Sequence, residues 1–167
     1  MHIIRFLVLM AIQIVLLNNI RLFGYFNPYL YLVFLLLLPV HIQGWLAMII
    51  GFVCGLVLDF FTGTLGLHAA SCTLACAVRP ILIDMFHNRK ELKKGLLPEI
   101  GWFGIRQYIL FSFLFVLIHH VTLFYLDAFS FHHFFRTFLM ALINTVITTT
   151  AVVLYQLIFH GNPSGTN

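Results

Sequence analysis

Long apolar runs divide the chain, and short segments rich in polar residues, glycine or proline separate them. About 20 consecutive apolar residues in a helix cross the hydrocarbon core of a bilayer. The pattern therefore predicts six membrane-spanning helices, at about 3–22, 29–42, 44–62, 66–86, 102–126 and 132–159. The second of these is the shortest, because Pro28 and Pro39 bound it, and a re-entrant segment is the alternative there.

Composition gives the same class of protein. Of the 167 residues, 62% are hydrophobic and only 8% are charged, with a mean hydropathy of +1.03. A soluble domain carries about a quarter charged residues, so this chain cannot cover a water-facing surface. We expect an all-α membrane protein with one six-span domain over residues 1–160 and a short tail at 161–167. The N-terminal apolar run lacks a small-residue cleavage site, and we interpret it as a retained first helix.

The basic residues predict the orientation. Seven of the nine lie on the side of the polar loop at 87–99, and only Arg21 and Arg136 lie on the other side. Because Lys and Arg are enriched in cytoplasmic loops, this loop and both termini are expected in the cytoplasm. The net charge of +4 reports orientation, and no recognition module for nucleic acid is present.

Three residues of the third expected helix stand out. Gly51, Gly55 and Asp59 recur at four-residue steps, which places them on one helix face. Small residues let membrane helices approach closely, whereas a carboxylate at membrane depth is costly unless something satisfies it. We expect Asp59 to bond the 62–64 turn or the N–H groups that open the next helix near Gly66 and Leu67. A contact with a partner protein is the alternative. The rise of a helix argues against a direct ion pair with Arg79.

The fourth and sixth helices carry further candidate residues. Arg79 precedes Pro80 inside a helix, where proline removes a backbone hydrogen bond and favours a kink. Arg79 could extend toward the lipid headgroups or make a fixed contact inside the bundle. The fourth helix opens with small residues, so a tight hairpin with the Gly51 and Gly55 face is expected. Asn144 begins a polar patch on the sixth helix and should bond another helix.

The remaining polar residues indicate no catalytic site. His119-His120 and His132-His133 are expected at one membrane boundary, and they lack the further ligands that would close a zinc site. Three cysteines lie within apolar runs and are interpreted as packing residues. No nucleophile with a base, paired carboxylates or phosphate-binding loop is present. We therefore predict no enzymatic activity, no cofactor and no metal.

The chain resembles the MreD family of rod shape-determining membrane proteins. The shared features are its size, six spans, cytoplasmic termini and the Gly51-x3-Gly55-x3-Asp59-x6-Gly66 pattern with Arg79-Pro80. The resemblance implies a component of the cell-wall elongation complex in the bacterial inner membrane that binds the membrane anchor of an MreC-like scaffold. Through that scaffold it would act with MreB, RodA and a penicillin-binding transpeptidase. It also implies a fold similar to the substrate-binding subunits of energy-coupling-factor vitamin transporters.

Such a vitamin-transporter subunit is itself the alternative function. These subunits dock their coupling partner through small residues spaced four apart on the first helix. Here Ala11 is the only small residue on the corresponding helix, and the outer loops are short and poor in polar groups. The gene neighbourhood would separate the two functions.

Overall fold

The computed structural model describes residues 2–15, 27–87, 95–129 and 133–160, and those residues form helices and connections with no strand. The helices are α1 (His2–Val15), α2 (Leu32–Leu36), α3 (Gly44–Thr62), α4 (Leu67–Phe86), α5 (Ile100–Phe103), α6 (Ile105–Ala128) and α7 (Phe134–His160). The prediction of an all-α fold is confirmed for the described residues.

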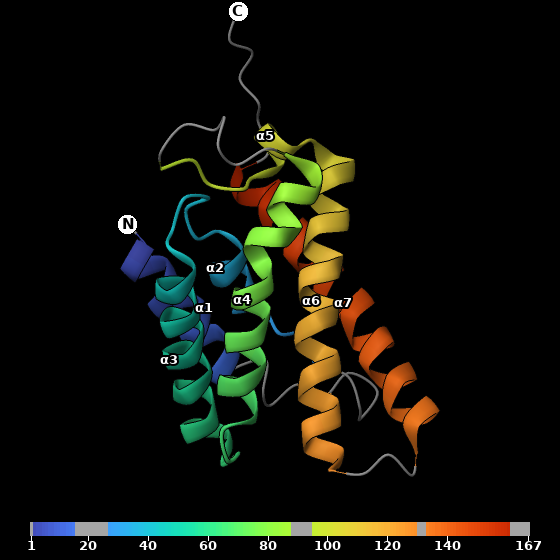
Figure 1. The fold of residues 1–167 in the computed structure, drawn as a ribbon. Coiled ribbons are helices and arrows are strands. Elements are labelled where there is room, and N and C mark those ends of the chain that lie inside the picture. The colour runs from blue at the N-terminus through green and yellow to red at the C-terminus, as the bar shows by residue number, and fades with distance from the viewer. Residues whose placement is uncertain (1, 16–26, 88–94, 130–132, 161–167) are drawn as a thin grey trace, which may run out of the picture.

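Four helices stand side by side in chain order. Figure 1 shows α3, α4, α6 and α7 in a row, and each contacts its neighbours in that order. All four are long and apolar enough to cross a membrane. The protein is therefore membrane-embedded. The expected spans at 44–62, 66–86, 102–126 and 132–159 correspond to these helices within a few residues, with α5 and Gly104 preceding α6.

The row of helices has two ends. The turn end carries residues 63–66, the C-terminus of α6 and the N-terminus of α7, and the basic end carries the C-terminus of α4 and α5 (Figure 1). The first expected span agrees with α1 as far as Val15, and its remainder at 16–22 lies outside the described residues, as does the tail at 161–167.

The expected helix at 29–42 is wrong in extent, because only Leu32–Leu36 are helical. Five residues of helix rise only about 7.5 Å, far less than a bilayer. Pro28 and Pro39 interrupt helical hydrogen bonding on either side. We call residues 27–42 the buried segment, since half of its residues are buried and only His41 is exposed.

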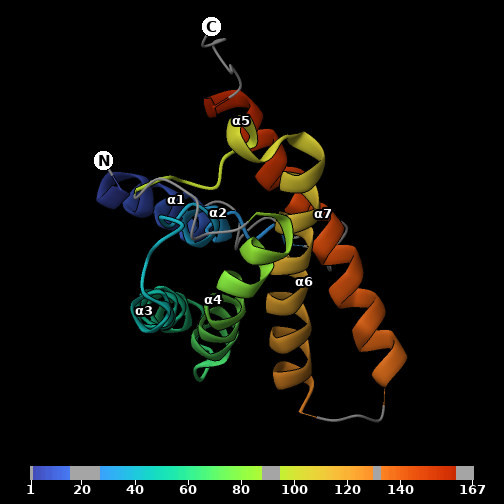
Figure 2. The ribbon, with the colours of Figure 1, turned by 45° about the horizontal axis from the view of Figure 1, so that its top comes forward.

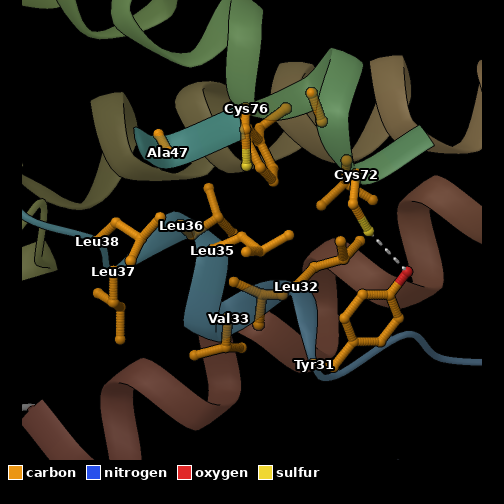
Figure 3. Packing of buried hydrophobic residues seen from close by; sticks show 14 of the residues in the cluster. Tyr31, Leu32, Val33, Leu35, Leu36, Leu37, Leu38, Ala47, Cys72 and Cys76 are labelled. Carbon is orange, nitrogen blue, oxygen red and sulfur yellow. Dashed lines mark hydrogen bonds between the residues drawn. The ribbon is translucent and has the colours of Figure 1, made fainter. Parts of the chain in front are cut away.

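The buried segment forms the centre of the core. Figure 3 shows Leu32, Leu35 and Leu36 of α2 packed against Cys72 and Cys76 of α4, with Ala47 of α3 beside them. All three cysteines of the chain are free and buried, so their predicted role as packing residues is confirmed. In Figure 2 the later part of α4 runs at an angle to the earlier part, and Pro80 lies within this helix.

Candidate functional site

The glycine face of α3 packs directly on α4. A Cβ atom built on Gly55 would lie 2.4 Å from the Cα of Ala69, and one on Gly51 would lie 2.8 Å from the Sγ of Cys76. Neither distance leaves room for a side chain, and the atoms that would clash at Gly55 are backbone. The predicted close hairpin of α3 and α4 is confirmed, and its small residues contact each other within the chain.

Asp59 closes this hairpin at the turn end. Its Oδ1 accepts a hydrogen bond from the backbone N–H of His68 at 3.0 Å, and its Oδ2 accepts one from the N–H of Ala69 at 2.9 Å. The hydroxyl of Thr64 and the Nδ1 of His68 also bond Oδ1. Because two N–H groups at the start of α4 are satisfied, Asp59 acts as a cap for that helix.

We call Asp59, Thr64, His68 and the N–H of Ala69 the Asp59 clasp. Asp59 is 3% exposed, so these contacts are its main solvation. The expected capping contact is confirmed, although the bonded N–H groups belong to residues 68 and 69 and not to Gly66 and Leu67. Gly66 contributes through its backbone, since its φ of +82° is a left-handed conformation that glycine adopts without strain.

Arg79 binds the end of the buried segment. Its guanidinium donates hydrogen bonds to the carbonyl oxygens of Leu36, Leu38 and Pro39. The side chain is 1% exposed. Of the two interpretations offered by the sequence, extension to the headgroups is therefore wrong and a fixed contact within the bundle is right. Asp59 and Arg79 have separate sets of partners, as the helix rise predicted.

Three other polar side chains bind the start of the buried segment. The Oδ1 of Asn144 accepts from the N–H of Asn27 at 3.2 Å, and the hydroxyl of Thr148 accepts from the N–H of Tyr29 at 3.2 Å. The amide oxygen of Gln13 accepts from the N–H of Leu30 at 2.8 Å. Asn144 was expected to bond another helix, whereas its partner across the bundle is backbone outside any helix.

These contacts explain how irregular backbone survives in the core. An unpaired backbone group in a membrane or in a protein interior is costly, so non-helical segments occur there only where protein or water satisfies them. Side chains from α1, α4 and α7 meet this requirement at both ends of the buried segment. Gln13, Arg79, Asn144 and Thr148 therefore serve to fix one segment in place.

The histidines of α6 are more buried than the sequence indicated. His119 and His120 were expected near a membrane boundary, and both are fully buried within the bundle. His119 Nε2 lies 2.8 Å from the hydroxyl of Tyr31, and His120 Nδ1 lies 3.1 Å from the hydroxyl of Thr145. The rings of both histidines contact Tyr29. His132 lies outside the described residues.

A periodic signal could have located these histidines. Tyr108, Phe111, Phe115 and His119 are all buried and recur at three- and four-residue steps on α6. That stripe continues the inward face of the helix through the histidine pair. The described residues hold no group of three or more His, Cys, Asp or Glu side chains able to bind a metal ion.

The chain matches no protein-family profile, no curated protein and no solved structure.

Proposed function

We propose that this protein is a non-catalytic integral membrane component of the bacterial cell-wall elongation complex, of the MreD type, that binds the membrane anchor of an MreC-like scaffold. One observation carries the proposal. The residues behind the sequence resemblance form a single structural unit, in which Gly51 and Gly55 join α3 to α4 and the Asp59 clasp fixes their turn. Gly66 shapes that turn, and Arg79, beside Pro80, ties α4 to the buried segment.

The chemistry of this unit supports a scaffolding role. Asp59 and Arg79 are the charged side chains buried most deeply in the described residues, and both are occupied by hydrogen bonds to the protein backbone. Such hydrogen bonds hold α4 to α3 and to the buried segment in one conformation. A rigid bundle that presents constant helix faces to the bilayer suits a protein that binds another helix.

The proposal assigns the anchor to the outward face of α3. Gly51 and Gly55 are already covered by α4, so a partner must use another surface. The opposite face of α3 is apolar and exposed along its length, through Ile49, Phe52, Val53, Leu56 and Phe60. In the bilayer, van der Waals packing drives association between such helices.

The remaining partners follow from the same resemblance. An MreC-like scaffold bound at α3 would link this protein to MreB in the cytoplasm and to RodA and a penicillin-binding transpeptidase in the membrane. This arrangement needs the orientation that the basic residues predict, with the 87–99 end in the cytoplasm.

Cross-linking in native membranes tests the assignment. Leu56→Cys on α3 should cross-link to a cysteine placed in the anchor of the scaffold encoded in the same genome. Leu139→Cys on α7, which is similarly exposed, is the matched control and should not. Equal cross-linking from both positions, or from neither, would contradict the assignment to α3.

Gene deletion tests the function itself. Loss of the protein should widen or round a rod-shaped host while leaving vitamin uptake normal. Loss of uptake with normal shape would instead favour the substrate-binding subunit of a vitamin transporter.

A further inference from the structure

An open, surface-facing cavity of about 330 Å³ lies between α6 and α7 near the turn end. In Figures 1 and 2, α6 and α7 diverge toward the C-terminal end of α6 and the N-terminal end of α7. Phe124 and Met140 give the cavity apolar walls, and Asp127, His133, Arg136 and Thr137 give it polar ones. The volume is at the lower end of the range for small-molecule sites, so it suits a compact polar group.

The two charges in this cavity are placed against the helix dipoles. Asp127 belongs to the last turn of α6, where the helix end is partially negative, and Arg136 belongs to the first turn of α7, where it is partially positive. Each charge is therefore on the helix end that disfavours it. The described residues contain no ion pair between Asp127 and Arg136, although both line one cavity.

This arrangement complements a zwitterion. An anionic group bound to Arg136 would also gain from the positive end of α7. A cationic group bound to Asp127 would gain from the negative end of α6. Each group of the ligand would offset the unfavourable placement of the side chain that binds it.

The surroundings indicate that the zwitterion is part of a lipid. The cavity lies where two membrane-spanning helices end, which is the level of the lipid headgroups. Large apolar side chains around it are exposed and available to acyl chains: Leu126, Phe129, Phe134, Phe135, Phe138 and Leu139. A soluble zwitterion has no acyl chains to pack against these side chains.

We propose that this cavity binds the headgroup of a phospholipid with a primary amine, such as phosphatidylethanolamine, with the phosphate on Arg136 and the ammonium on Asp127. A primary ammonium donates hydrogen bonds to the carboxylate, whereas a quaternary ammonium cannot and is usually recognised by several aromatic rings. Among the described residues that line the cavity, Phe124 alone carries a phenyl ring, so choline lipids should bind less well. This site is independent of the proposed role in cell-wall elongation.

Native mass spectrometry of the full-length protein with an equimolar mixture of phosphatidylethanolamine, phosphatidylcholine and phosphatidylglycerol tests the site. The parent protein should retain phosphatidylethanolamine preferentially. Asp127→Asn should reduce that preference about tenfold, the loss expected for one charge-assisted hydrogen bond. Arg136→Gln should weaken retention of all three lipids, because each carries a phosphate.

Arg106→Gln is the matched control, since Arg106 is also an exposed arginine in the first turn of a helix but lies at the other end of α6. It should leave retention unchanged, and all variants should unfold at the temperature of the parent. Equal retention of ethanolamine and choline lipids by the parent would overturn the proposal. So would the same lipid profile for Asp127→Asn and Arg106→Gln. Displacement of bound lipid by soluble phosphoethanolamine at similar concentration would show a soluble ligand and would also overturn it.

Discussion

Removing the carboxylate of Asp59 is the sharpest test of the α3–α4 hairpin. In Asp59→Ala, the N–H groups of His68 and Ala69 lose their acceptor while remaining buried. An unsatisfied buried group costs about 1–3 kcal/mol, so the two together destabilise the folded bundle by roughly 2–6 kcal/mol. A charge at membrane depth costs about 3 kcal/mol when the chain inserts, and Asp59→Ala removes that cost. The variant should therefore insert normally and unfold more easily.

Thermal unfolding of the purified protein in detergent measures this effect. For a chain of this size each kcal/mol corresponds to about 2–4 °C, so a loss near 3 kcal/mol lowers the midpoint by roughly 6–12 °C. Asp59→Asn keeps one acceptor oxygen and should lose about half as much. Asp127→Asn removes an exposed carboxylate at the same end of the bundle and should change the midpoint little. A midpoint for Asp59→Ala equal to that of the parent would falsify the stabilising role of the Asp59 clasp.

Three further predictions concern packing, the buried segment and orientation. Gly55→Leu should sharply lower the amount of folded protein in membranes, because a Cβ atom there already lies 2.4 Å from backbone, and normal accumulation would mean that α3 and α4 do not pack as described. Arg79→Met should leave three carbonyl oxygens without their donor and lower the thermal midpoint by several degrees. Arg79→Lys keeps a donor and should lower the midpoint less. Equal midpoints for these two variants would contradict the hydrogen-bonding role. A cysteine at Asn88 should resist a membrane-impermeant thiol reagent applied to whole cells, whereas one at Ser130 should react, since the native cysteines are buried. Efficient labelling at Asn88 would mean that this loop faces the outside of the cell and that the predicted orientation is wrong.

The sequence predicted the long helices and the hairpin because those features depend on local patterns. The run from 44 to 62 is apolar apart from Asp59 and ends at Thr62-Gly63, so its bounds agree with α3. The four-residue spacing of Gly51, Gly55 and Asp59 places all three on one helix face, and this does not depend on the rest of the fold. The capping role of Asp59 followed from its position one turn before the end of its own helix, next to the short connection to the following helix.

The buried segment could not be predicted in the same way. Residues 29–42 are as apolar as a spanning helix, and periodicity cannot separate a helix from irregular backbone that is buried on all sides. The difference depends on Gln13, Asn144 and Thr148, which are far away in the sequence. The interior contact of Arg79 depends on the same segment, since its acceptors are the carbonyl oxygens that a regular helix would have used.

The distance in sequence between the buried segment and its partners constrains the order of biogenesis. Asn144 follows Asn27 by 117 residues and Thr148 follows Tyr29 by 119, so neither acceptor exists when the segment leaves the ribosome. At about 5–20 residues per second, translation alone imposes a delay of roughly 6–24 s. The N–H groups of residues 27 and 29 must stay hydrated or bind other groups during that interval. Residues 27–42 therefore reach their final position only after α7 has been inserted. Insertion of the C-terminal helix is then the step that completes the packing of the N-terminal half of the protein.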